Sequence, residues 1–437
     1  MPETILEKGS FSDSSLLKQL SNRIPAILFI AAFLVTLYRF TQSPPAGGLG
    51  LEVMAVSKSL ARDGTFANPY LAAQTGPTAL IPPLYPFYLA FLMRLGGDEF
   101  RFGFLMISSV ICAHALHASL LPAVSELFFG NRLPGVYGAI LFIALPCFEV
   151  ILAREAVYVA IGLMTFCLVA QRIAQSRLNN ALKGALLGIV TGVLLLLNPV
   201  SLLFCVIWAV YLLIARREPL GRARFGAGFA VGLVLTCLPW TIRNYRELGG
   251  LVFVRSNFGL ELYVANNGCA EASLVRNMLN GCHAATHPNV NQVEALKVKQ
   301  MGEISYNREK RSAAFRWIRA NPRRFSSLTV QRTWLFWFPY RDVFSPADGY
   351  SVCLITFLSI FGLLDLLRYS KPIGFWILAA SLLCSGLYCF MQADMCYRYP
   401  ILWLSLLCAG YFAARYIHPR WKRTRLLDQA AGQFKRW

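Results

Sequence analysis

The 437-residue chain is short of charge. Only 15% of its residues are charged, whereas 56% are hydrophobic. A soluble domain averages about 25% charged and 45–50% apolar residues. The mean hydropathy is +0.49, and long apolar runs recur from residue 24 to residue 417. This composition excludes an ordinary soluble protein and predicts an all-α polytopic membrane protein.

Several catalytic motifs are also missing. The chain contains no GxxxxGK[ST] phosphate loop, no GxGxxG after a strand and no HExxH helix. Chemistry driven by a bound nucleotide is therefore unsupported. The 12 cysteines include no CxxC pair, which argues against zinc ribbons and thioredoxin-like chemistry. We find no repeat of 20–50 residues and no low-complexity tract.

The apolar runs predict a topology. With the N-terminus inside, every predicted inner segment carries Lys or Arg, as the positive-inside rule requires. An even number of spans returns the C-terminus to the cytoplasm. The net charge of +20 then reflects topology in large part, and no nucleic-acid partner is expected. The ten expected spans are 24–41, 102–122, 134–152, 156–173, 184–198, 200–215, 225–241, 350–367, 373–391 and 398–416.

Two outward segments, 42–101 and 242–349, are too long to be simple turns, and loops of this length are usually functional. They divide the chain into a transmembrane module at 1–241, a mostly helical outward region at 242–349, and a second transmembrane module with a basic cytoplasmic tail at 350–437.

Smaller elements are expected within these two segments. Residues 86–95 are apolar but too short to span a bilayer, which favours a helix in the membrane interface. Residues 334–340 are typical of an aromatic interface anchor. Residues 291–320 are expected to be helical, with an interruption at Gly302 and a stop at Asn321 before proline.

Glu52 is the first candidate for chemistry, because it lies about a dozen residues outside the first span. A carboxylate there could act as a general base or help to hold a metal ion; the alternative is a solvated loop acid. The proline-rich stretch 76–86 must follow a non-helical path. That path either holds Thr78 and Tyr85 toward a site or only reverses the chain.

The outward region is strongly basic, with 14 Lys and Arg against six Asp and Glu over residues 243–332. Long loops escape the topology rule, so an anionic lipid phosphate would explain the excess; an interfacial belt of charge is the alternative. Arginine suits phosphate capture, and asparagine can orient sugar hydroxyls. For Arg398, at the start of the last span, the alternative is snorkelling to the interface. The candidates are Arg243, Arg255 and Arg398 for phosphate, and Asn244, Asn257, Glu261 and Asn266 for the acceptor or the sugar.

Cys269 and Cys282 are both expected on the oxidising side of the membrane. Thirteen residues separate them, and His283 and His287 lie nearby. Three arrangements stay open at this point: a disulfide, two free thiols, or a zinc site.

The order of these pieces resembles the lipid-dependent GT-C glycosyltransferases, specifically the bacterial branch of glycosyltransferase family 39, which is related to the protein O-mannosyltransferases and the aminoarabinose transferases. The resemblance covers most of the chain. It rests on Gly50-Leu51-Glu52, Gly76-Pro77-Thr78-Ala79, Pro83-Leu84-Tyr85-Pro86, Trp240, Arg243-Asn244, Gly259, Asn266-Asn267, His287-Pro288, Gly302-Glu303, Tyr306, Asn321-Pro322 and Tyr397-Arg398-Tyr399-Pro400.

The resemblance implies a GT-C-type fold with about 10–12 transmembrane helices in a bacterial cytoplasmic membrane, with the active site facing outward. It implies hexosyl or pentosyl transfer from a polyprenyl-phosphate-linked sugar to a hydroxyl or amine of a lipid, glycan or protein acceptor. Membrane lipids are further partners.

Glu52 matches the acidic residue in the first outward loop of that family. It would deprotonate the acceptor in an inverting displacement with an oxocarbenium-like transition state, while arginines neutralise the leaving phosphate. Thr78 and Tyr85 would help to bind the donor. Many members have a second carboxylate next to the first, where this chain has Leu51, and a need for a divalent metal stays open.

Two other classes compete with a transferase. A transporter or flippase for lipid-linked saccharides would share the many spans and the basic outer region, but such proteins often contain internal repeats. A catalytically inactive relative that serves as an assembly partner is the third hypothesis.

Overall fold

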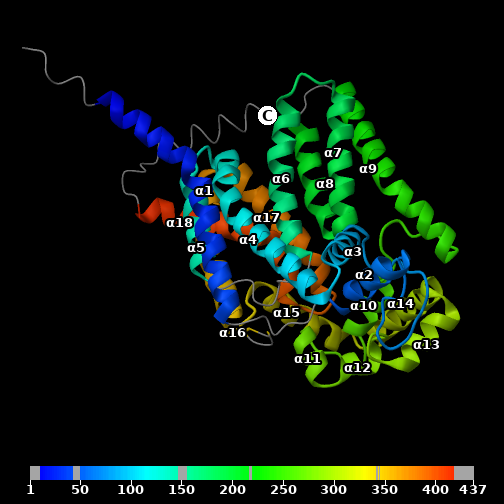
Figure 1. Cartoon of the computed structure of the whole chain (residues 1–437). Coiled ribbons are helices and arrows are strands. Elements are labelled where there is room, and N and C mark those ends of the chain that lie inside the picture. The colour runs from blue at the N-terminus through cyan, green and yellow to red at the C-terminus, as the bar shows by residue number, and fades with distance from the viewer. Residues whose placement is uncertain are drawn as a thin grey trace, which may run out of the picture.

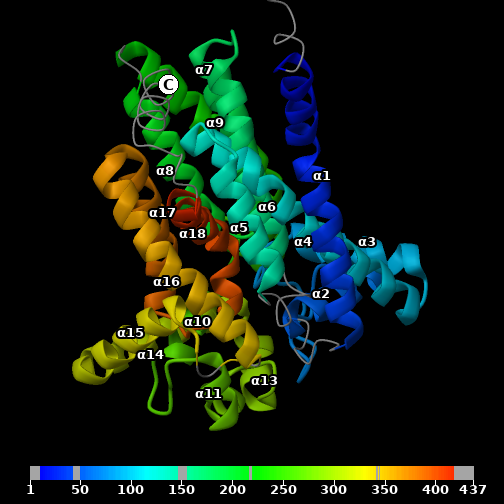
Figure 2. The ribbon, with the colours of Figure 1, turned by 90° about the vertical axis from the view of Figure 1, so that its left-hand side faces the viewer.

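Figure 1 shows the computed structural model of the chain, which describes residues 10–42, 50–145, 155–215, 219–340, 343 and 345–417. This part of the chain is built from helices and contains no β-strand, only two isolated bridges. Two bodies of helices can be distinguished, a long bundle and a set of shorter helices at one of its ends (Figures 1 and 2).

The bundle contains the long apolar helices. Among the described residues, eight helices are long and apolar enough to cross a membrane, and two more apolar helices, α5 and α8, are shorter. The chain is therefore an integral multi-pass membrane protein. The bundle consists of α1 (Ser10–Gln42), α4 (Glu99–Phe129), α5 (Leu133–Ala144), α6 (Ala156–Gln175), α7 (Asn180–Leu197), α8 (Val200–Ala215), α9 (Pro219–Leu248), α16 (Pro346–Tyr369), α17 (Lys371–Cys389) and α18 (Leu402–Ile417).

These ten helices occupy the ten positions predicted from the sequence, but several boundaries differ; α1, for example, begins at Ser10 rather than at residue 24. Helix α4 begins earlier than predicted, because the side chain of Asp98 caps it by accepting from the Arg101 amide (2.8 Å). Helix α5 ends at Ala144 rather than 152; residues 146–154 lie outside the described part. Helix α9 continues past 241 to Leu248 and stops before Gly249, whose φ is +70°.

The shorter helices form what we call the end layer: α2 (Leu51–Asp63), α3 (Leu84–Gly96), α10 (Phe258–Ala265), α11 (Leu274–Leu279), α12 (Cys282–Thr286), α13 (Gln292–Met301), α14 (Glu303–Ala320) and α15 (Pro322–Trp337). Figures 1 and 2 both place them at the same end of the bundle. A small core joins Tyr70 and Leu80, from the segment between α2 and α3, to Leu260, Val298 and Tyr306. The two long predicted outward segments therefore fold together.

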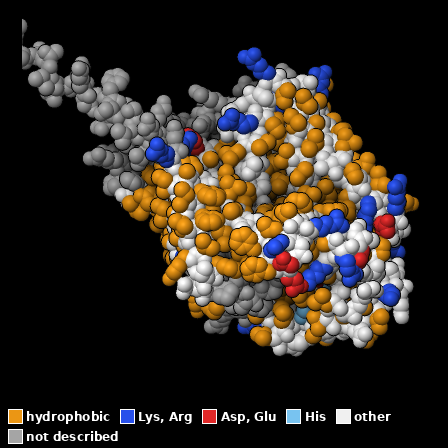
Figure 3. Space-filling model, in the orientation of Figure 1, with side chains coloured by type: hydrophobic (Ala, Val, Ile, Leu, Met, Phe, Trp, Pro, Cys, Tyr) orange, Lys and Arg blue, Asp and Glu red, His pale blue; other side chains and the backbone are white. Residues whose placement is uncertain are grey.

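The predicted helices of these segments are present. Gly302 separates α13 from α14 with φ +78°, and α14 ends before Asn321. Helix α3 contains the predicted stretch 86–95, with Phe87, Phe91 and Leu95 exposed along it. Figure 3 shows hydrophobic side chains over the bundle, while charged side chains gather mainly over the end layer and at the opposite tip.

The last predicted span begins differently from expectation. Two short 3₁₀ helices, η1 (Met395–Tyr397) and η2 (Tyr399–Ile401), precede α18. Arg398 lies between them and is only 1% exposed.

Candidate functional site

The candidate site is built around the proline-rich segment between α2 and α3. Asn68 and Gly76 close its loop through two hydrogen bonds: the Asn68 amide donates to the Gly76 carbonyl, and the Gly76 amide donates to Asn68 Oδ1 (both 2.9 Å). Both residues have positive φ (+56° and +84°), which asparagine and glycine tolerate best. Beyond the loop, the chain is non-helical from Pro77 and bends at Leu80, Ile81 and Pro83 before α3 begins at Leu84. The non-helical path predicted for residues 76–86 is confirmed as far as Pro83, but residues 84–86 form the first turn of α3, where proline is tolerated because its missing N–H has no helical partner there.

Glu303, at the start of α14, anchors this segment. Its buried carboxylate accepts hydrogen bonds from the Thr78 hydroxyl, from the Ala79 amide (2.8 Å) and from the Ser256 hydroxyl (2.6 Å). Burial raises the pKa of Glu303, and these hydrogen bonds together with the charge of Arg243 counter part of that increase. Thr78, predicted to bind the donor, is fully buried and committed to this carboxylate.

Two of the predicted arginines brace the same segment. Arg243, on α9, donates to the carbonyls of Thr78 (2.6 Å) and Phe66 (2.7 Å). Arg255 donates from Nε to the Leu80 carbonyl (2.8 Å). Its side chain remains 32% exposed, and its Nη2 lies 3.7 Å from Glu261. Both terminal nitrogens of Arg243 therefore donate to backbone carbonyls, whereas part of the Arg255 guanidinium remains accessible.

Glu52 lies in the first turn of α2 and is 24% exposed. Its Oε1 is 3.7 Å from Nε2 of His287, which follows α12. The ring of His287 stacks on His283 (centroids 4.6 Å apart, planes 18° apart) and packs edge-on against Tyr70 (6.2 Å). This brings an acid from the first outward segment against two histidines from the second.

Burial determines the charge state of these neighbours. It lowers the pKa of His287 and lowers that of His283 to about 4, so both rings are neutral at neutral pH. Burial also raises the pKa of Tyr70, and the negative charges of Glu303, Glu52 and Glu261 raise it further. The Tyr70 hydroxyl is buried without a hydrogen-bond partner among the described residues.

The predicted sugar ligands have different surroundings. Asn257 donates to Glu261 (2.8 Å), which places both beside Arg255. Asn244 is buried and donates to the Val252 carbonyl (3.1 Å). Asn266 is also buried; it donates to the carbonyls of Leu262 and Phe390 (both 2.9 Å).

Tyr85 and Arg398 lie apart from the Glu303 hydrogen bonds. Tyr85 is buried and packs on Tyr88 and Tyr158, with ring centroids 6.2 and 5.8 Å away. The Arg398 guanidinium lies over the Trp337 ring (4.0 Å) and donates from Nη2 to Ser405 (2.5 Å). Its Nε and Nη1 are buried without a partner among the described residues.

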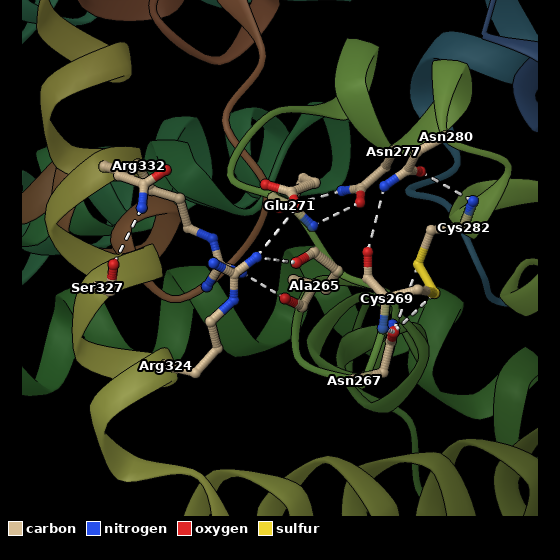
Figure 4. A network of polar contacts seen from close by, with 12 residues as sticks. Ala265, Asn267, Cys269, Glu271, Asn277, Asn280, Cys282, Arg324, Ser327 and Arg332 are labelled. Carbon is tan, nitrogen blue, oxygen red and sulfur yellow. Dashed lines mark hydrogen bonds and ion pairs between the residues drawn. A yellow bond between two sulfur atoms is a disulfide. The ribbon is translucent and has the colours of Figure 1, made fainter.

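Cys269 and Cys282 form a disulfide, which decides between the three arrangements left open by the sequence and excludes the zinc site built on these thiols. Figure 4 shows the polar contacts around it. The Cys269 amide donates to Asn267 Oδ1 (2.9 Å), and Asn280 links the two half-cystines by donating to the Cys269 carbonyl (3.3 Å) and accepting from the Cys282 amide (3.0 Å). His283 and His287 follow directly after this braced loop.

Further contacts tie the disulfide loop to the rest of the end layer. Arg324, on α15, donates to the Ala270 carbonyl (3.3 Å) and pairs with Glu271 (3.1 Å; Figure 4). Asn277 donates to Gln392 (3.2 Å). Within the described ranges, no group of three or more His, Cys, Asp or Glu could hold a metal ion.

An open pocket of about 630 Å³ lies along α2 and α3. Ala55 and Ser59 line it, and they lie one and two turns beyond Glu52 on the same face of α2. Its polar lining includes Lys58, Arg62 and Asn68. The pocket therefore opens along the helix that carries Glu52.

Reasoning from the sequence did not assign roles to Tyr70, Asn289 or Arg332. Asn289 accepts from the Leu71 amide (3.1 Å), and Arg332 is fully buried and donates to Asn266 Oδ1 (3.1 Å). Glu303 entered only as part of a family motif. An acid or arginine that is buried by distant segments has no local signature in the sequence. Apart from the family motif, the predicted helix break at Gly302 was the one local signal next to Glu303.

No family model and no curated protein sequence matches the chain. Among solved structures, it is similar to the oligosaccharyltransferase of Archaeoglobus fulgidus tethered with an acceptor peptide, with a TM-score of 0.51 and 11% identity over 94% of this chain and 53% of that chain. The chain thus spans about half the length of that protein. ArnT from Cupriavidus metallidurans bound to undecaprenyl phosphate overlaps with a TM-score of 0.40 and 15% identity, over 94% and 84%.

The likeness to the oligosaccharyltransferase concerns the fold alone. Together with the apolar helices, it shows an integral membrane protein with a GT-C-type fold. The TM-score of the ArnT overlap is too low to add to this conclusion. The fold predicted from the sequence is confirmed.

Proposed function

We propose that this protein is a membrane glycosyltransferase that transfers a sugar from a polyprenyl-phosphate donor to an acceptor hydroxyl or amine at the outer face of the membrane. The observation that carries the proposal is Glu52. It is a partly exposed carboxylate at the start of α2, beside a buried histidine and along the helix that lines an open pocket. The GT-C-type fold, seen in an oligosaccharyltransferase, supports the transferase class.

In the proposed reaction, Glu52 accepts the proton of the acceptor hydroxyl or amine. As that proton leaves, the acceptor oxygen or nitrogen attacks the anomeric carbon with a lone pair, and the bond from that carbon to the lipid phosphate breaks on the opposite face, with inversion. The phosphate leaves with the bonding electron pair and needs charge neutralisation rather than a proton. Arg255 is our first choice for this role, because its guanidinium is accessible and lies beside Glu261 and Asn257.

The other predicted ligands fit this scheme less directly. Arg243 and Thr78 hold the 76–80 segment, and we propose that they shape the donor site without touching the phosphate. Asn244 and Asn266 would act in the same indirect way. Glu261 and Asn257 remain our proposed contacts to the sugar. Arg398 and Tyr85 remain our proposed contacts to the lipid-phosphate part of the donor.

The proposed orientation places the end layer outside the cell and both termini in the cytoplasm. Arg172, Arg177 and Lys183 support it, because they lie around the connection between α6 and α7, at the bundle end opposite the end layer (Figure 1). Basic residues favour the inner side. The basic tail and part of the other inner segments lie outside the described residues.

The test compares lipids by mass spectrometry in membranes from cells with the wild-type protein, with Glu52→Gln, with Glu309→Gln and without the protein. Glu309 is an exposed acid on α14 of the end layer and is not among the residues that line the pocket along α2 and α3, so its variant is the matched control. We expect one glycosyl-phosphoryl-polyprenol to accumulate in the Glu52→Gln and null strains, because loss of a general base slows turnover by roughly 10²–10⁴-fold.

Other outcomes would decide differently. Accumulation in the null strain alone, with normal turnover in Glu52→Gln, would remove Glu52 as the base and favour a flippase or an assembly role. Unchanged lipids in all strains would contradict a lipid-linked donor.

A further inference from the structure

His287 contacts Glu52 from a different part of the chain. Only 5% of its surface is exposed, and its Nε2 faces the Glu52 carboxylate at 3.7 Å. This is longer than a hydrogen bond, which spans about 2.7–3.2 Å. Catalytic hydrogen bonds are often long in the free enzyme and tighten when substrate binds.

The backbone determines which nitrogen of His287 carries the proton. The Asn289 amide donates to Nδ1 of His287 (3.1 Å), so Nδ1 is an acceptor and the proton of the neutral ring is on Nε2. Asn289 is itself held by the Leu71 amide, which donates to its Oδ1 (3.1 Å). The proton-bearing nitrogen is thus directed toward Glu52 by contacts that tie two distant segments together.

The surroundings keep this ring neutral. Burial lowers the pKa of His287, and the negative charge of Glu261 only partly counters it. The titratable groups around the pair are Glu52 on α2, His283 on α12, Tyr70 from the segment before α3, Glu261 on α10 and Glu303 on α14. His283 is neutral as well. At neutral pH, the group that faces Glu52 is therefore an uncharged N–H donor.

We propose that His287 is a positioning residue for Glu52: its Nε2–H holds the carboxylate in the orientation needed to take the acceptor proton. The proposal rests on the proposed function. His287 keeps its own proton throughout, and the acceptor proton ends on Glu52. A donor to a carboxylate favours the charged form that acts as a base, so the pH–rate profile is the measurement that tests this contact.

Two amide variants separate positioning from a structural role. His287→Gln places an amide nitrogen near the position of Nε2 and keeps a donor for Glu52. His287→Asn places its amide oxygen near the position of Nδ1 and keeps the acceptor for the Asn289 amide, but it has no group that reaches Glu52. Both are assayed in membranes as consumption of the glycolipid extracted from cells without the protein, with thermal unfolding measured in parallel.

We expect His287→Asn to lower kcat by roughly 10–100-fold, as for other residues that orient a catalytic group, with little change in KM. The acid limb of its pH–rate profile should move to higher pH, and His287→Gln should restore most of the rate and the wild-type profile. The inference is overturned if Asn is as active as Gln, if both match the wild type, or if both lose activity equally with an unchanged pH profile.

The Glu52→Gln variant distinguishes the two failures. If Glu52→Gln is inactive while both His287 variants behave as the wild type, only the positioning role is wrong. If Glu52→Gln turns over normally, Glu52 is not the general base, and the proposed function loses the observation that carries it.

Discussion

At the residue scale, the end layer contains two carboxylates with opposite environments. Glu52 is partly exposed and faces an N–H donor across 3.7 Å. Glu303 is buried and accepts from Thr78, Ala79 and Ser256. A carboxylate whose oxygens are already occupied is poorly placed to accept a substrate proton, whereas an accessible one can. We therefore propose a catalytic role for Glu52 and a structural role for Glu303.

Replacing Glu303 by alanine tests this division. Two buried donors, from Thr78 and Ala79, and the half-buried Ser256 hydroxyl would lose their acceptor, and each unpaired buried group costs about 1–3 kcal/mol. We expect Glu303→Ala to lower the free energy of unfolding by about 3 kcal/mol or more. Thermal unfolding of the detergent-purified protein measures it. Glu309→Ala, which removes an exposed acid from the same helix, should change the midpoint little; equal effects of the two variants would contradict the assigned role.

At the scale of elements, α7 and α9 pack with their backbones close together. A Cβ added at Gly184 or Gly188 of α7 would lie 2.1 Å from the carbonyl oxygens of Phe225 and Phe229, and one added at Gly228 of α9 would lie 2.0 Å from that of Ala181. Small residues four apart permit this approach, which is a common way to associate helices in lipid. The pair supports the junction from which Arg243 reaches the site.

Gly188→Ala is predicted to destabilise the protein although alanine favours helix by about 1 kcal/mol over glycine. The added methyl would meet backbone on α9, which cannot move aside as a flexible side chain can, and overpacking typically costs about 1–3 kcal/mol. Gly226→Ala, on α9, is the control because nothing lies within 4 Å of its added Cβ. The midpoint temperature of thermal unfolding should fall for Gly188→Ala only. A higher midpoint temperature in both variants would contradict the prediction, because it would show that α7 and α9 can move apart to accept the methyl group.

At the scale of the whole molecule, the site depends on segments that are distant in sequence. Glu52 comes from α2, Glu303 from α14, and the arginines from α9 and the chain before α10. The disulfide Cys269–Cys282 stabilises the loop that delivers His283 and His287 to Glu52. The stability of that loop therefore affects the geometry of the site.

We expect reduction of the disulfide to destabilise the folded protein by about 3 kcal/mol, the chain-entropy value for a loop of about 15 residues. Thermal unfolding with and without reductant measures this. The Cys269→Ser/Cys282→Ser protein should match the reduced wild type and should not respond to reductant, since none of the nine other described cysteines forms a disulfide. An equal response of both proteins to reductant would place the effect elsewhere.

The sequence by itself determined the membrane class and the positions of the ten apolar helices. This was possible because burial in lipid needs about 20 consecutive apolar residues, which is a local property. Helix ends were less accurate, as at α5 and α9, because caps and packing set them. The break at Gly302 could also be read locally, since glycine permits a positive φ.

Only the tertiary structure decided how the candidate residues are used. Arg243 and Thr78 are 165 residues apart, and their hydrogen bond turns two predicted ligands into supports for the 76–80 segment. The tertiary structure also paired Cys269 with Cys282, 13 residues away, buried Glu303 and Arg398, and placed His287 beside Glu52. Composition and spacing do not encode such contacts, because the partners of a polar group are set by whichever distant segments bury it.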